Sequence, residues 1–160
     1  MLVVSEHTLK WLLRLYPPLL LQRVWVQEFG RNFKSVKVKI NKSLINRNYN
    51  GSIFGGTIFA AADPFLPVLF SQVLNPDGKR KLKIWSKSSK IEFLKPGLTD
   101  LFFELKITDA DVSEFEQALT VLGKYEKAYP IEIFNTGGEV CVLLHNEVYV
   151  RDLDVSKRLI

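Results

Sequence analysis

A long apolar segment in the middle of the chain constrains the fold more than any other feature. It runs from Thr57 to Leu74 and reads TIFAAADPFLPVLFSQVL. The segment is too long and too rich in alanine and leucine for a strand, so we predict a mostly buried helix. The turn sequence NPDG at 75–78 ends it. Pro64 and Pro67 should kink or restart the helix, because proline breaks its backbone hydrogen bonds.

The segments around this helix favour strands and two further helices. Apolar and polar residues alternate with a period of two at 36–41, 81–94, 101–108, 129–135 and 139–151, and 22–30 is a plausible further strand. The spacing predicts amphipathic helices at 6–16 and from Asp111 or Ser113 to 122. Strands and helices in this order indicate an α+β fold with an antiparallel sheet.

Length and composition fit one globular domain. The chain has 160 residues and 18.4 kDa, with 47% hydrophobic and 24% charged residues, and we find no linker or repeat. The single cysteine, Cys141, cannot form an internal disulfide. We therefore expect a single domain over 1–160, with an N-terminal helical segment at 1–21, a core at 22–151 and a tail at 152–160.

The leucine-rich N-terminus is neither a secretion signal nor a membrane span. Glu6, Lys10 and Arg14 interrupt it, and its longest apolar run contains Pro17 and Pro18. We expect the helix at 6–16 to cover the domain core or a partner subunit, with membrane attachment as the alternative. These features predict a cytoplasmic protein without a membrane partner.

Positive charge is concentrated in one part of the chain. Residues 29–91 hold twelve basic and two acidic side chains, a charge of 12 − 2 = +10, whereas the remainder holds ten basic and fifteen acidic ones, or −5. Such segregation fits a phosphate-bearing ligand, nucleic acid or a membrane surface. Alternating lysines on the solvated face of a sheet would explain it equally well.

Several kinds of chemistry lack the residues they need. The two histidines, His7 and His145, have no metal-ligand spacing, and no serine or cysteine triad has good candidates. Gly55-Gly56 is not followed by the lysine and hydroxyl residue of a P-loop. The aromatic and basic motifs of nucleic-acid binding are absent from the sequence. We therefore predict no metal, no cofactor and no nucleic-acid partner.

One constellation remains, at the start of the predicted central helix. Gly55 and Gly56 precede the apolar segment, and unpaired N–H groups at a helix start carry the positive end of its dipole. Glycines let a ligand carbonyl approach such N–H groups closely, as in an oxyanion site. Asp63 follows within the apolar run, where desolvation should raise its pKa and suit it as a general base or nucleophile. Alternatively, Asp63 and Pro64 are the N-cap and first residue of a new helix.

The stretch from Asn48 to Asp63, N-x-x-G-x-x-F-G-G-x-x-F-x-x-A-D, resembles the active-site segment of hotdog-fold acyl-CoA thioesterases of the PaaI-like type. The Asp63-Pro64 pair, the segment WSKSSKIEFLKP and the final YVR are similar to an uncharacterised thioesterase-like branch of that superfamily. The resemblance covers roughly 22–151 and implies a hotdog fold, in which a curved antiparallel sheet wraps a long central helix. It also implies a homodimer or homotetramer whose active sites draw on two chains.

The resemblance implies a role for each matching residue. Asp63 matches the carboxylate that activates water or attacks the thioester, and Asn48 matches an asparagine of the site. Gly55 and Gly56 match the glycines whose N–H groups polarise the thioester carbonyl. Ser86 matches a polar residue that helps to hold the water, and a small shift in register would give that role to a neighbouring serine, 88 or 89.

Two features bear on the substrate and on catalysis. Phe54 stands where the family usually has histidine, so one polar contact to the thioester is lost and Phe54 lines the acyl site instead. The protein is thus a thioesterase or, alternatively, a non-catalytic hotdog module that binds acyl groups or a protein partner. The basic residues expected to bind the phosphates of an acyl-CoA are Lys79, Arg80, Lys81, Lys83, Lys87 and Lys90.

Overall fold

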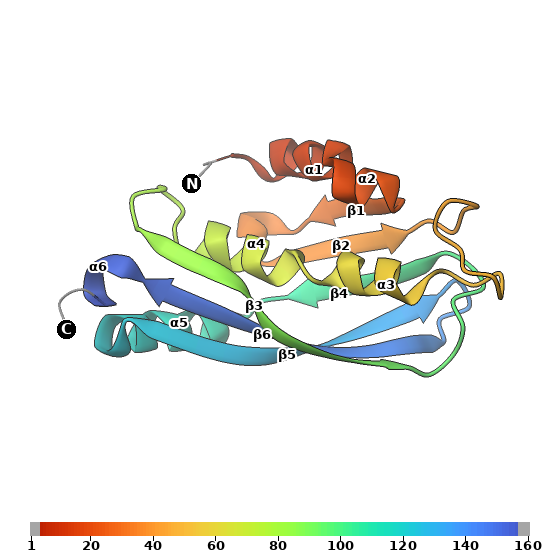
Figure 1. Ribbon diagram of the computed structural model, residues 1–160. Helices are drawn as coiled ribbons and strands as arrows, with labels where there is room; N and C mark the ends of the chain where they lie inside the picture. The colour runs from red at the N-terminus through yellow and green to blue at the C-terminus, as the bar shows by residue number, and fades with distance from the viewer. Residues whose placement is uncertain (1–3, 157–160) are drawn as a thin grey trace.

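The computed structural model describes residues 4–156 and shows a curved antiparallel sheet that wraps two consecutive central helices (Figure 1). The helices are α1 (Glu6–Leu15), α2 (Pro17–Leu21), α3 (Gly55–Ala62), α4 (Phe65–Val73), α5 (Asp109–Leu122) and α6 (Leu153–Ser156), with a short 3-10 turn at Arg31–Phe33. The strands are β1 (Val24–Phe29), β2 (Ser35–Ile40), β3 (Leu82–Phe93), β4 (Leu101–Lys106), β5 (Lys124–Asn135) and β6 (Val140–Asp152). The predicted α+β class is confirmed.

The six strands form one sheet in the order β1-β2-β4-β5-β6-β3, and every neighbouring pair is antiparallel. Among the strands of the described residues, β3 pairs only with β6, so β1 and β3 are the two edges of the sheet. A tight turn joins β5 to β6, in which the Gly138 N–H donates to the Asn135 carbonyl (3.1 Å). The long connection through α3 and α4 carries the chain from β2 across the sheet to β3 at the far edge.

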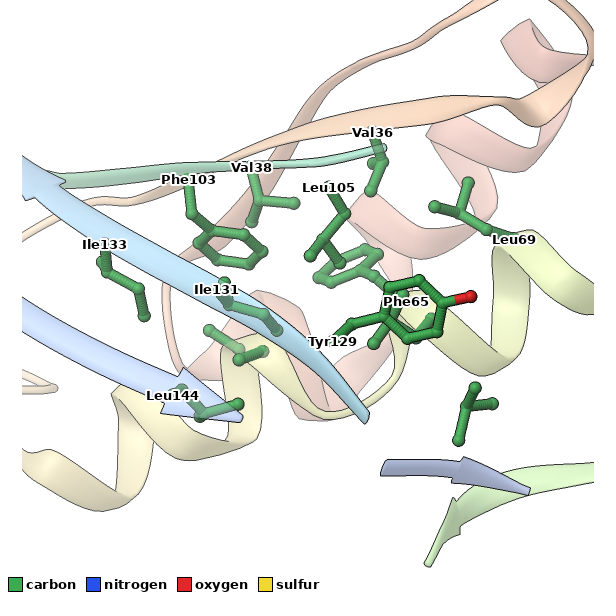
Figure 2. Close-up of a cluster of buried hydrophobic side chains, with 14 of the residues drawn as sticks. Val36, Val38, Phe65, Leu69, Phe103, Leu105, Tyr129, Ile131, Ile133 and Leu144 are labelled. Atoms are coloured by element: carbon green, nitrogen blue, oxygen red, sulfur yellow. The ribbon is translucent and has the colours of Figure 1, made fainter. Parts of the chain in front are cut away.

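The core lies between the concave face of the sheet and the two central helices. Figure 2 shows inward side chains of four strands, among them Val38, Phe103 and Ile131, pointing toward the helical residues Phe65 and Leu69. All five are buried, and the rings of Phe65 and Phe103 meet edge to face. The alternation of each strand thus supplies one apolar face, and the apolar segment at 57–74 fills the trough that this face forms.

The central helix is interrupted where the sequence predicts it. Helix α3 ends at Ala62 and α4 begins at Phe65, because Pro64 has no N–H to continue the ladder. The whole stretch Gly55–Val73 has the length and apolar character of a membrane-spanning helix. Four of its residues in α4 are buried against the sheet, however, which makes it the core helix of this domain.

The N-terminal helices cover the β1 edge of the sheet. Leu9 of α1 and Leu19 of α2 are buried, and Figure 1 shows both helices lying beside β1. The Arg14 guanidinium donates from Nε to the carbonyl of Val26 (2.8 Å) and lies over the ring of Trp25. The N-terminal segment therefore packs on the core of its own domain, as one of the two predictions for it stated.

Helix α5 begins earlier than predicted. Its N-cap is Thr108 rather than Asp111 or Ser113, because Thr108 Oγ1 accepts from the Asp111 N–H while the Asp111 carboxylate accepts from the Thr108 N–H. The chain after β6 forms α6, so the first part of the predicted tail is helical. The last part of that tail, 157–160, lies outside the described residues.

Candidate active site

The first turn of α3 presents two N–H groups that are free to bind a ligand. Phe54 is its N-cap residue and offers no side-chain cap, while its carbonyl accepts from the N–H groups of Thr57 (2.9 Å) and Ile58 (3.3 Å). No acceptor in residues 4–156 reaches the N–H groups of Gly55 or Gly56. Both therefore point out of the helix start, where the dipole favours negative charge.

Two phenyl rings flank the glycine pair. A Cβ at Gly55 would lie 2.9 Å from Cζ of Phe93, and a Cβ at Gly56 would collide with the ring of Phe54. Both rings are more than half exposed, so they border the free N–H groups without sealing them from solvent. The glycines therefore make room for the rings as well as for a ligand.

A surface hollow of about 390 Å³ opens beside Gly55. We call it the Gly55 hollow; it is lined by Asn48, Ser52, Ile53, Gly55, Ile58, Phe93, Leu94, Lys95, Pro96 and Gly97. Its size lies at the lower end of the range for small-ligand sites. Most of its walls are apolar, so it suits a short apolar group next to the free N–H of Gly55.

Asn48 borders this hollow and shapes the loop before α3. Its Oδ1 accepts from the N–H groups of Asn50 (3.0 Å) and Ser52 (3.2 Å) and from the Ser52 hydroxyl (3.2 Å). These bonds fold residues 48–52 into a tight turn that brings Asn48 next to the glycine pair. The structure thus brings together Asn48 and Gly55, and the hydrogen bonds to the Asn48 side-chain oxygen stabilise the loop between them.

Asp63 lies at the break between α3 and α4. Its backbone is helical (φ −56°, ψ −50°) and no side chain caps α4, so the alternative prediction of an N-cap at Asp63 is wrong. Its carboxylate is partly buried and has no hydrogen-bond or ion-pair partner in residues 4–156. Seven residues of helix separate Asp63 from Gly56, about 10 Å along the axis, and the Gly55 hollow does not include Asp63.

Ser86 lies directly beside Asp63 but contacts its backbone. The Ser86 hydroxyl donates to the Asp63 carbonyl (2.9 Å), and the Asn146 side-chain amide approaches the same oxygen at 3.4 Å. A helical carbonyl at 63 would normally accept from residue 67, which is Pro67 and has no N–H. The two polar side chains replace that missing donor.

The neighbouring serines point to different groups. The Ser88 hydroxyl donates to Glu147 (2.7 Å), while that of Ser89 lies 3.4 Å from the Asn146 side-chain oxygen.

Sequence reasoning missed Asn146, which is fully buried on an inward-facing position of β6. A lone amide in an otherwise apolar inward row was the available signal.

The predicted phosphate-binding cations do not gather at the Gly55 hollow within one chain. Lys83 and Phe93 stand ten residues apart in β3, about 33 Å, and the cluster at 79–83 lies at the Lys83 end. Arg80 is engaged in structure, since its guanidinium binds Glu116 (2.7 Å) and Asp152 (3.2 Å).

The charge segregation seen along the chain is largely neutralised in space. Eight of the twelve basic side chains of 29–91 form ion pairs, and most of their partners come from outside that stretch. They are Lys34, Lys37, Lys39, Lys79, Arg80, Lys81, Lys87 and Lys90. The fold therefore places acidic side chains from other parts of the chain beside these basic side chains, so the stretch 29–91 does not form one continuous basic surface.

The cation that does border the hollow is Lys95, which lies just outside the charged stretch. Its Nζ lies 2.7 Å from Oε1 of Glu139, and this hydrogen bond raises the pKa of Lys95. The same bond, with a second one from Asn135, lowers the pKa of Glu139. The pair is therefore charged at neutral pH. Within residues 4–156 no cluster of three or more metal-ligating side chains occurs.

Comparison with known proteins identifies the family. The sequence matches the family described as Domain of unknown function (DUF4442) over residues 6–150. The chain belongs to the DUF4442 family. No curated protein matches this DUF4442 chain.

Solved structures similar to this DUF4442 protein show its fold. A Pseudomonas aeruginosa protein of unknown function, described as a probable thioesterase, has a TM-score of 0.78 at 17% identity, with 93% of this chain and 97% of that chain covered. A Haemophilus influenzae thioesterase has a TM-score of 0.70 at 14% identity, with coverages of 94% and 92%. The E. coli PaaI protein of the phenylacetic acid degradation operon has a TM-score of 0.55 at 19% identity, with coverages of 82% and 86%. The protein thus has the hotdog fold of the thioesterase superfamily, as its sequence resemblance implies.

Proposed function

We propose that this protein hydrolyses a thioester, such as an acyl-CoA, at the start of α3. The observation that carries the proposal is the pair of free N–H groups at Gly55 and Gly56, because Gly55 lines a hollow of ligand size and Gly56 follows it in the same helix turn. Thioesterases with the same fold support the reaction class.

The chemistry follows from these groups. The two N–H donors bind the thioester oxygen and stabilise the negative charge that develops on it, an effect worth about 3–4 kcal/mol for a well-placed donor. The Asp63 carboxylate accepts a proton from water, and the resulting hydroxide oxygen attacks the carbonyl carbon. Collapse of the tetrahedral intermediate breaks the C–S bond, and the departing thiolate takes up the proton that Asp63 accepted from water, which restores the carboxylate. Carboxylic acid and free thiol are the products.

A second copy of the chain fits this mechanism. Asp63 and the glycine pair of one chain are about 10 Å apart along the helix axis, and within residues 4–156 no strand pairs with the outer side of the edge strand β3. We propose a homodimer through this edge, in which the glycine pair of one protomer faces the carboxylate of its partner. The cytoplasmic location stays a prediction.

The test removes the carboxylate and keeps its shape. Asp63→Asn should lower thioester hydrolysis at least about 100-fold, because general-base catalysis contributes about 10²–10⁴-fold. Asp109→Asn is the matched control, since its side chain is fully exposed at the start of α5. Turnover of a panel of short, long and aromatic acyl-CoAs gives the rates. An active Asp63→Asn variant with parental kcat would exclude the proposed role.

The alternative is a hotdog module that binds acyl groups without hydrolysing them. The observation that favours it is the Phe54 ring, which lies against Gly56. PaaI-like hotdog thioesterases, which this stretch of sequence resembles, usually have a polar histidine at that position. Calorimetric titration with the same acyl-CoAs distinguishes the two functions. Tight binding with no release of free thiol over hours would establish the binding module.

A further inference from the structure

Lys95 is held in a fixed position beside the Gly55 hollow. It lies two residues after the end of β3, and its N–H donates to the carbonyl of Cys141 (3.0 Å), as does the N–H of Leu94 (2.9 Å). Cys141 belongs to β6, so the sheet anchors the backbone at this point. Pro96 and Gly97 continue the wall of the hollow. The side chain of Lys95 therefore starts from a rigid base.

The Lys95 ammonium retains donors for a ligand. It gives one hydrogen bond to Glu139 (2.7 Å), and an ammonium has three N–H donors. Glu139 is itself oriented from its other oxygen by the Asn135 side-chain amide (2.9 Å). About half of each side chain of the pair is exposed, so a ligand can reach the ammonium from solvent.

Among the described residues, no other charged side chain lines the hollow. The remaining lining side chains are either apolar, such as Ile53, Ile58 and Phe93, or neutral and polar, as in Asn48 and Ser52. Glu139 contacts Lys95 but is not part of the lining. A single cation in an otherwise uncharged small-ligand site is a feature that fixes ligand orientation and specificity.

We propose that Lys95 binds an anionic group of the thioester substrate, so that the preferred substrates carry a negative charge within reach of the Gly55 hollow. The proposal rests on the proposed function and adds a substrate class to it. The shared chemistry is a carboxylate or phosphate on the ammonium. It comes from one of two sources: the far end of a dicarboxylic acyl group, or the phosphates of the thiol carrier.

The experiment separates these sources with four substrates. Glutaryl-CoA and pentanoyl-CoA have chains of equal length with and without a terminal carboxylate, and the N-acetylcysteamine thioesters of the same two acids lack every phosphate. Lys95→Met keeps the length of the side chain and removes its charge. Lys106→Met is the matched control, because Lys106 is an exposed lysine of β4 that is paired with Glu104.

Lys95→Met should raise KM about tenfold, equal to about 1.4 kcal/mol, only for substrates that carry the recognised anion. An effect on both glutaryl esters identifies the acyl carboxylate, whereas an effect on both CoA esters identifies the carrier phosphate. Glu139→Gln should act in the opposite direction and lower the same KM values, because it removes the negative charge that competes for Lys95. Melting temperatures of the variants check that each one is folded.

Two results would overturn the inference. One is an unchanged KM for all four substrates in Lys95→Met, and the other is an equal change for all four, which would indicate a purely structural effect. In both cases the parent still hydrolyses thioesters, so the proposed function survives. A parent protein that hydrolyses neither these four esters nor any member of the panel of short, long and aromatic acyl-CoAs would instead refute both proposals together.

Discussion

The two edges of the sheet differ in whether other parts of the described chain cover them. At the β1 edge, α1 and α2 lie against the strand, a bulge interrupts its register after Val26, and Arg14 donates to the carbonyls of Val26 and Gln27. At the β3 edge, twelve residues run along the sheet and no further strand of the described chain pairs with them. Unpaired edges invite association with another chain. The fold thus closes one edge with its own chain and leaves the other open, as the proposed homodimer requires.

The inner faces of the two edge strands differ as well. Inward residues of β1 such as Val24 and Val26 are fully buried in the apolar core. The inward row of β3 instead includes Ser86, which holds the backbone of Asp63. The open edge is thus also the edge that contacts the break in the central helix, and assembly and the candidate site are expected to depend on each other.

The largest effect is expected from proline in β3. Successive N–H groups of a strand point to opposite sides, so Ile91→Pro and Glu92→Pro remove one donor to β6 and one donor to the free edge. In the variant that loses the bond to β6, the free energy of unfolding should fall by about 3 kcal/mol, because a buried carbonyl is left unsatisfied. The other should keep its stability and raise the dissociation constant of the dimer about tenfold or more, since two-fold symmetry removes each edge bond twice.

Light scattering across a dilution series and thermal melts give the two readouts. The pair of variants is its own control, because both introduce the same residue into the same strand. If both remain as dimeric as the parent, the β3 edge is not the subunit interface. If the parent is monomeric throughout, no second copy completes the site.

Opening the covered edge should have the next largest effect. Arg14→Ala removes two hydrogen bonds to β1 carbonyls and the contacts of the guanidinium with the Trp11 and Trp25 rings. We expect it to destabilise the protein by about 2 kcal/mol and to increase its tendency to aggregate through β1. Urea denaturation measures the loss of stability, and light scattering measures the aggregation. The control Arg14→Lys should recover part of the stability, because it restores the charge but not the planar stacking.

The smallest effect concerns the inner face of β3. Ser86→Ala should cost about 1 kcal/mol, the usual net value of one hydrogen bond, because it removes a donor to the Asp63 carbonyl. Pro67→Ala returns the backbone donor at that point of the helix, so Ser86→Ala should cost less in a Pro67→Ala background. A double-mutant cycle by urea denaturation measures the difference. Additive effects would show that Ser86 does not substitute for the donor that Pro67 lacks.

Local patterns predicted most of the fold. The period-two alternation located five strands, the apolar segment located the central helix, and Pro64 located its break, because each of these depends on neighbouring residues alone. The N-cap of α5 was misplaced by a few residues, since Thr108, Asp111 and Ser113 are all suitable cap residues by type. The start of β5 at Lys124 was missed, because its inward residues Tyr125 and Lys127 are too polar to resemble a strand face.

The candidate site was only partly predictable. The glycine pair, Asn48 and Asp63 lie within one stretch of sequence, and the resemblance that they carry gave the fold correctly. Lys95 lies 95 − 63 = 32 residues beyond the end of this stretch and reaches it only because β3 ends next to Gly55. A contact of this kind depends on the pairing of distant strands, which no local pattern records.

The sequence by itself determined the α+β class, the enclosed central helix with its proline break, and the free N–H pair at the helix start. These follow from hydrophobic period, backbone donors and helix ends, which are properties of adjacent residues. Only the tertiary structure decided which charges meet. It paired the basic stretch with acids from elsewhere, engaged Arg80 between α5 and β6, and left Lys95 at the hollow. Electrostatic contacts act through space, so their partners are fixed by the fold and not by the order of residues.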